Sequence, residues 1–190
     1  DVHLAYWLRS DSGSSIKYRR WFETGILSEA ETISTQVDLT GNVSLGVSRG
    51  DATFAFHDQV TGLHFARTRR RGGELEDSVR LGEDRAMVAI DSPAVALALV
   101  DGTAHLAYRQ REFSDRASSL YRRRIENAGW GSPAYLDGRI NSRYSGIAID
   151  IAVFGDRVAV AYLDWSDGTT ELRLVTWSTT PDDLEVRGVA

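Results

Sequence analysis

The hexapeptide "AHLAYR" at residues 104–109 decides how this sequence is interpreted, because three relatives of it occur elsewhere in the chain. They are "VHLAYW" at 2–7, "ATFAFH" at 52–57 and "VAVAYL" at 158–163. The four copies begin at residues 2, 52, 104 and 158, so successive copies start 50 to 54 residues apart. Self-similarity at a nearly constant period indicates a repeat architecture, in which each copy builds one supersecondary unit.

Each unit repeats the same order of segments around this anchor hexapeptide. In the later units an apolar run and a tight turn precede the anchor, and in every unit a polar loop, a third segment, a bend and a fourth segment follow it. The segments are about 5–8 residues long and rich in Val, Ile, Leu, Tyr and Phe, which is typical of β-strands. The sequence therefore predicts four repeats, at residues 1–42, 43–93, 94–146 and 147–190.

Alternation within the anchor predicts how the units pack. Leu106 and Tyr108 should point to one face of the strand and Ala107 to the other, because successive strand residues face opposite ways. The other copies keep this order as Leu4-Ala5-Tyr6, Phe54-Ala55-Phe56 and Val160-Ala161-Tyr162. Because both faces of the strand are apolar, both must be covered by neighbouring sheets. Close packing then requires the large side chains of one sheet to lie opposite the small side chains of the next. This predicts an all-β fold, a β-propeller portion of about four four-stranded antiparallel blades. A β-sandwich is the alternative, but it has no reason to repeat its sequence.

The first unit differs from the other three. Apolar segments precede the anchor at 43–48, 95–100 and 147–154, whereas the first anchor begins at residue 2. We therefore expect the first blade to lack its innermost strand, which would leave unpaired backbone groups beside the propeller axis. This predicts that the chain is the C-terminal part of a longer propeller. Another chain, either the upstream fragment or a second copy, would complete it.

Bulk composition narrows the possible functions. The formal net charge is −5, from 22 basic and 27 acidic residues, which argues against nucleic-acid binding. No apolar run approaches the roughly 20 residues needed to cross a bilayer, so no membrane span is expected. Cysteine is absent, which excludes disulfides and thiolate chemistry. The sequence has no His-x-His pair, nucleophile elbow or phosphate loop, and we expect no cofactor.

A family resemblance rests on three short motifs: the anchor in "AHLAYR", the following "LYRRR" at 120–124 and "GWGSP" at 129–133. The unit resembles the bacterial propeller repeats of the sialidase-like, or BNR-type, superfamily, with a second likeness to fucose-binding lectin propellers. The family's Asp box, Ser-x-Asp-x-Gly-x-x-Trp, is not intact. The segments "SDSGSSI" and "WSDGTTEL" are similar to it, but they fall between the second and third strands, whereas the box lies between the third and fourth.

The resemblance implies a binding face, shared by the loops between second and third strands and those between units. The residues expected there are Trp7, Asp84, Arg85, Asp91, Arg139, Asn141, Arg143, Tyr144 and Trp165. We expect a non-enzymatic recognition or scaffold module, extracytoplasmic or secreted, that binds a protein or a glycan. The alternative is part of a sialidase-like glycoside hydrolase. Tyr144, Arg139 and Arg143 are the right residue types for one, but two arginines in one loop are not a triad spread over separate blades.

Three further motifs have simple structural explanations. Asp164 and Asp167 could ligate Ca²⁺, but they lack EF-hand spacing, and turn chemistry is the favoured interpretation. The tripeptide "RGD" at 49–51 fills the turn before the second anchor, as "VDG" does before the third. His3 and His105 occupy the same repeat position, so we attribute both to strand geometry and not to a metal site.

The basic residues follow a pattern of their own. Only Lys17 is a lysine, and arginines cluster on the third segments in "RTRRR" at 67–71 and "YRRRI" at 121–125. Acidic fourth segments such as "ELEDS" lie nearby in the chain. Opposite charges on neighbouring strands stabilise a sheet, so we expect these arginines to form ion pairs across strands and not a nucleic-acid patch.

Overall fold

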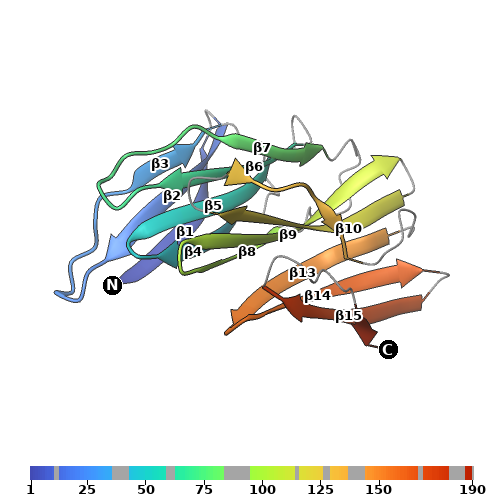
Figure 1. Ribbon diagram of the computed structural model, residues 1–190. Coiled ribbons are helices and arrows are strands. Elements are labelled where there is room, and N and C mark those ends of the chain that lie inside the picture. The colour runs from blue at the N-terminus through green and yellow to red at the C-terminus, as the bar shows by residue number, and fades with distance from the viewer. Residues whose placement is uncertain are drawn as a thin grey trace.

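The computed structural model describes residues 1–10, 13–35, 43–58, 63–83, 95–113, 116–125, 129–136, 144–166, 169–179 and 187–189. The regular secondary structure of these residues is entirely β, in four antiparallel sheets that follow one another along the chain (Figure 1). No helix in this part of the chain is long and apolar enough to cross a membrane. The predicted all-β propeller portion is therefore confirmed, with one sheet for each repeat.

Strand order within each sheet follows the chain. The first sheet contains β1 (Val2–Ser10), β2 (Gly13–Trp21) and β3 (Glu31–Ser34). The second contains β4 (Val43–Ser48), β5 (Asp51–Asp58), β6 (Leu63–Arg69) and β7 (Val79–Glu83). The third contains β8 (Val95–Val100), β9 (Thr103–Phe113) and β10 (Arg116–Ile125), with β11 (Gly129–Trp130) and β12 (Ala134–Tyr135) both paired to β10. The fourth contains β13 (Tyr144–Phe154), β14 (Arg157–Ser166), β15 (Thr169–Ser178) and β16 (Arg187–Val189).

The anchor hexapeptides lie in equivalent strands, β1, β5, β9 and β14. In the second to fourth sheets the anchor pairs with a preceding strand, β4, β8 or β13, and these three strands lie next to one another where the sheets converge. Among the described residues nothing pairs with the corresponding edge of β1. The expectation that the first blade lacks its innermost strand is therefore confirmed for the described part of the chain.

The fourth segments are less regular than the sequence suggests. In the first two sheets each begins with a single bridge to the third strand, at Leu27 or Leu75, and continues after a bend as the short β3 or β7. A register shift then leaves Ile33 in β3 and Leu81 in β7 as the extra residue of a β-bulge. A bulge residue does not pair in the ladder, so its backbone carbonyl can accept hydrogen bonds from outside the sheet.

Tight turns join the first and second strands. Arg49 and Gly50 have φ angles of 53° and 87°, and Asp101 and Gly102 have 49° and 81°. Two central residues with positive φ define the type I′ turn, whose twist matches that of the flanking strands. The "RGD" tripeptide therefore lies in the predicted turn.

The sheets stack so that the large-residue face of each covers the alanine face of the sheet before it. The residues that share a core cluster are Phe54 with Ala5, Leu106 with Ala55, and Val160 with Ala107, from the first interface to the third. Phe54, Leu106 and Val160 are each 0 % exposed. Burying one such side chain contributes about 1.5–3 kcal/mol. Successive sheets therefore stabilise one another through the alternation that the anchors display.

A histidine–tyrosine hydrogen bond recurs in the first and third sheets. His105 Nδ1 lies 2.8 Å from the Tyr121 hydroxyl, and His3 Nδ1 lies 2.6 Å from the Tyr18 hydroxyl. This supports attributing both histidines to strand geometry. Burial, with a smaller effect of Arg123, lowers the pKa of His105 to about 4. Burial also raises the pKa of Tyr121 to about 12, so both partners are neutral at pH 7.

Enlarging a buried alanine should destabilise the stack. Ala107 is 0 % exposed at the interface of the third and fourth sheets. Ala107→Leu overpacks this interface, and we expect a loss of about 1–3 kcal/mol in the free energy of unfolding. Ala152→Leu is the control, because Ala152 is an exposed strand alanine. Thermal denaturation measures both variants, and a melting temperature unmoved by Ala107→Leu would contradict the stacked arrangement.

Burial of neutral His105 should make stability depend on pH. The folded-state pKa lies below the unfolded value of 6.5, so the unfolded state takes up the proton first as pH falls. The contribution of neutral His105 to the free energy of unfolding is fully present above about pH 6.5 and declines toward pH 4. Urea unfolding at pH 7 and pH 4.5 should show His105→Gln reducing that decline by on the order of 2 kcal/mol. His3→Gln should reduce it less, since His3 is less buried. An unchanged decline in His105→Gln would show that His105 is protonated in the folded state.

Candidate functional site

The sheets have two different ends. At the hairpin end, the second strands β1, β5, β9 and β14 finish and turn back into the third strands. At the turn end, the first strands enter the second strands through tight turns. The expected binding face corresponds to the hairpin end. Six of its predicted residues lie outside the described part of the chain: Asp84, Arg85, Asp91, Arg139, Asn141 and Arg143.

The three remaining predicted residues are aromatic and lie toward the hairpin end. Trp7 is on β1, opposite Ile16 of β2, and is 45 % exposed. Tyr144 was expected in the loop between the third and fourth units, but it is the first residue of β13 and is the cross-strand partner of Trp165 on β14. The fourth blade thus begins slightly before the boundary at residues 146 and 147 expected from the sequence pattern.

Three buried polar residues lie at the hairpin end, and none of them was expected on the binding face; Asp164 alone was considered, as a possible Ca²⁺ ligand. Arg109, Asp164 and His57 lie on β9, β14 and β5 and are 1 %, 2 % and 5 % exposed. Burying such groups is costly unless they are paired or hydrogen-bonded. A signal for two of them was available, because the last position of the anchor hexapeptide varies between Trp7, His57, Arg109 and Leu163, whereas the three positions before it are apolar in every copy.

Asp164 forms an ion pair within the fourth sheet. Its Oδ2 lies 2.9 Å from Nε of Arg173 on β15. This interaction accounts for one of the two aspartates considered as Ca²⁺ ligands, and Asp167 lies outside the described residues. Within the described ranges, no group of three His, Asp or Glu side chains could hold a metal ion.

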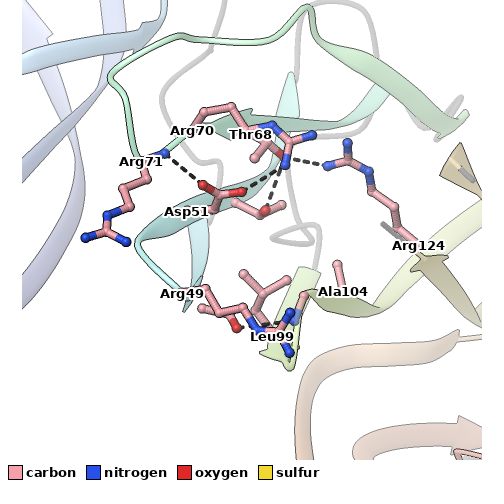
Figure 2. A pocket seen from close by; sticks show the side chains of 11 residues that line it. Arg49, Asp51, Thr68, Arg70, Arg71, Leu99, Ala104 and Arg124 are labelled. Atoms are coloured by element: carbon pink, nitrogen blue, oxygen red, sulfur yellow. Dashed lines mark hydrogen bonds and ion pairs between the residues drawn. The ribbon is translucent and has the colours of Figure 1, made fainter. Parts of the chain in front are cut away.

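A pocket lies at the turn end, between the second and third sheets (Figure 2). It has a volume of about 260 Å³ and is lined by Ser48, Arg49, Asp51, Thr53, Thr68, Arg70, Arg71, Leu99, Gly102, Ala104 and Arg124. Figure 2 shows Arg124 of the third sheet reaching toward Thr68 of the second. Its Nη1 donates a hydrogen bond to the Thr68 hydroxyl at 2.6 Å.

A chain of ion pairs surrounds this pocket, and one of them joins the two sheets. Arg70 contacts Asp51 at 2.8 Å and Glu76 at 2.5 Å, and Arg124 of the third sheet contacts the same Glu76 at 3.0 Å. Burial opposes ionisation of Asp51, but hydrogen bonds from Arg70 and from the Arg71 amide outweigh it and lower its pKa. Glu76 therefore links the two sheets, whereas Asp51 is held within the second sheet.

The arginine ion pairs were expected between strands of one sheet, but some of them join different sheets. Third-strand arginines do pair with acidic fourth segments, as Arg70 does with Glu76, but the pairs also run between sheets. Arg69 of the second sheet contacts Glu31 of the first at 2.6 Å. The predicted ion pairs are confirmed for Arg69, Arg70 and Arg124. Arg67, Arg122 and Arg123 donate hydrogen bonds to backbone carbonyls instead.

Comparison with known proteins gives a likeness in structure alone. No family model matches the chain, and no curated protein matches it in sequence. Solved structures similar to it include the catalytic domain of a GH62 α-L-arabinofuranosidase from Coprinopsis cinerea, with 12 % identity and a TM-score of 0.49, covering 99 % of this chain and 63 % of that one. A thermostable family-43 glycoside hydrolase has 13 % identity and a TM-score of 0.48, covering 98 % and 74 %.

A third similar structure is a DUF4623 family protein from Bacteroides eggerthii, with 14 % identity and a TM-score of 0.46. The match covers 95 % of this chain and 40 % of that protein. The chain thus spans less than two thirds of the arabinofuranosidase domain and of the DUF4623 protein. The sialidase-like and fucose-lectin resemblances find no support beyond the propeller fold. These likenesses assign no activity, and the fold rests on the sheet topology described above.

Proposed function

We propose that this chain is a non-enzymatic recognition module that binds a carbohydrate at the hairpin end of its blades. The observation that carries the proposal is the exposure of Trp7 at this end, together with the cross-strand pair of Tyr144 and Trp165 on the fourth sheet. Aromatic rings present an apolar face with negative electrostatic potential. The C–H groups on one face of a sugar ring complement such a surface.

Buried polar groups supply the second element of such a site. Ligand sites combine apolar and aromatic lining with a few polar groups in fixed positions. Arg109 and Asp164 are almost fully buried, and Asp164 is also fixed by its ion pair with the partly exposed Arg173. They can keep the hairpins above them in one conformation, which favours binding because less conformational freedom is lost.

A glycoside hydrolase is the second candidate, favoured by the buried carboxylate of Asp164 at the same end. Most glycosidases require a pair of carboxyl groups flanking the scissile bond. Asp164 faces Arg173 at 2.9 Å, which suits a positioned carboxylate better than a general acid. The side chain of Asp58 at the end of β5 lies outside the described set, so a second carboxyl group is not assigned. The hydrolase therefore stays the second candidate, and the activity assay below distinguishes it from a recognition module.

Removing aromatic rings at the hairpin end should weaken carbohydrate binding. We expect Trp7→Ala and Trp165→Ala to weaken binding about tenfold each, which is a loss of about 1.4 kcal/mol. Trp21→Ala is the matched control, because Trp21 is 52 % exposed at the other end of β2 and should not matter. A glycan array, followed by calorimetry with soluble arabinoxylan and its oligosaccharides, measures the effect. Arabinosides are included because one of the similar structures named above is an α-L-arabinofuranosidase domain.

Two results would contradict this proposal. The first is turnover of 4-nitrophenyl α-L-arabinofuranoside that Asp164→Asn abolishes while the variant keeps its circular dichroism spectrum, because this would identify a hydrolase. The second is an array with no carbohydrate bound by the folded chain. An equal loss of binding in Trp21→Ala would place the ligand away from the hairpin end.

A further inference from the structure

The first sheet presents a large-residue face that nothing in the described structure covers. Leu4 on β1 is 41 % exposed, although its counterparts Phe54, Leu106 and Val160 are each 0 % exposed. In the second to fourth sheets this face packs on the alanine face of the preceding sheet. On the first sheet it consists of Val2, Leu4 and Leu8 of β1 and Trp21 of β2, which are 41–57 % exposed. We refer to these four residues as the open face.

A third-strand arginine connects the second sheet to the first. Arg67 is the cross-strand partner of Phe54. Its Nε donates to the Glu76 carbonyl of its own sheet at 2.7 Å, and its Nη1 donates to the Ile33 carbonyl of the first sheet at 2.6 Å. Ile33 is the bulge residue of β3, whose carbonyl is free of the ladder. One guanidinium thus joins its own fourth segment to that of the preceding sheet.

The same contact recurs one blade later. Arg122 is the partner of Leu106. It donates through Nε to the Gly131 carbonyl of its own sheet at 2.9 Å and through Nη1 to the carbonyl of Leu81, the bulge residue of β7. Two interfaces therefore use one device, in which an arginine binds the bulge carbonyl of the preceding blade. The fourth sheet has Val175 at this position.

Arg19 completes only half of this contact. It is the cross-strand partner of Leu4, which is the register position of Arg67 and Arg122. Its Nε donates to the Ser28 carbonyl of its own sheet at 2.7 Å, as in the other two blades. No acceptor for its terminal nitrogens is found among the described residues. The guanidinium is thus already held at the position from which the other two arginines bind a preceding blade.

We propose that the open face, Arg19 and the free edge of β1 form a docking surface for a further blade of the same repeat type. The incoming protein supplies one strand that pairs with β1, as β8 pairs with β9, and a sheet whose small-residue face covers Leu4. It also supplies a bulge carbonyl on its fourth strand that accepts a hydrogen bond from Arg19. This interaction surface is independent of the proposed carbohydrate binding.

A second copy of residues 1–190 fits this surface only in part. Its fourth sheet does carry an uncovered small-residue face, since Leu174 is 43 % exposed where the equivalent Tyr18, Ala66 and Tyr121 are buried. However, Leu174 pairs with Val189, the last residue of β16. In the first two sheets, the residue equivalent to Val189 lies two positions before the bulge at Ile33 or Leu81. The described β16 therefore contains no counterpart of the bulge. The occupant that we propose is a blade whose fourth strand carries this bulge, as β3 and β7 do.

An extended chain tests the proposal. Residues 43–102 are placed directly before Asp1, so that the turn at 101–102 precedes Asp1 as it normally precedes Thr103. The copy of β8 then becomes the missing strand beside β1, and the copy of β7 brings its bulge at Leu81 to Arg19. We expect one cooperative melting transition, at a higher temperature than for the original chain. The amide hydrogens of β1 should exchange at least about tenfold more slowly than they do in the original chain.

Substitutions in the extended chain identify the arginine contact. Arg19→Met should lower its melting temperature by about 2–4 °C, as expected for roughly 1 kcal/mol in a protein of this size. Arg122→Met is the matched control, since it loses the same contact at an interface already described, and its effect should be similar. In the original chain, Arg19→Met should have a smaller effect than Arg122→Met, because only the Ser28 contact is lost.

Three outcomes would overturn the proposal. One is a separate, earlier melting transition for the added segment, with unchanged exchange at β1. Another is an extended chain in which Arg19→Met has no effect while Arg122→Met lowers the melting temperature. The third is a concentration-dependent dimer of the original chain in sedimentation velocity that Leu4→Asp abolishes, because this would show that a second copy is the occupant.

Discussion

The packing of large side chains on alanines is the interaction on which the rest of this structure depends. Each anchor strand has a large face and a small face, and each sheet covers the small face of the one before it. Ala55 and Ala107 are fully buried. A larger side chain at either position would push the neighbouring sheets apart. The contact has a direction, so a stack built from it always has one uncovered large face and one uncovered small face unless it closes into a ring.

The two ends of the sheets perform different tasks once this packing has set the spacing of the blades. At the turn end, ion pairs such as Arg124 with Glu76 link successive sheets, and type I′ turns join the first strands to the second strands. At the hairpin end, the second strands carry buried polar residues, Arg109 among them, and the exposed Trp7. Rigid strands therefore support a variable surface, which is the usual relation between scaffold and binding loops.

Much of this fold was predictable from local sequence. The anchor period predicts the number of sheets, and the alternation in Leu106-Ala107-Tyr108 predicts which side of each is crowded, because strand geometry has a strict period of two. The bulges at Ile33 and Leu81 and the ion pairs between sheets were not predictable. They depend on which residues of distant segments meet, and short fourth strands contain too little periodicity to reveal a register shift. Of the residues expected on the binding face, Trp7 is exposed. Arg109 was overlooked and the buried ion pair of Asp164 was not expected, because buried polar partners are not visible in a local pattern.

A size exchange across one interface tests the packing account most directly. Leu106 and Ala55 belong to the same buried cluster between the second and third sheets. Leu106→Ala should cost about 2–5 kcal/mol and Ala55→Leu about 1–3 kcal/mol in the free energy of unfolding. If the large residue of one sheet fills the space left by the alanine of the other, the double variant should recover at least about 1 kcal/mol relative to the sum of the single losses. Strictly additive losses in denaturant unfolding would contradict large-on-small packing as the organising contact.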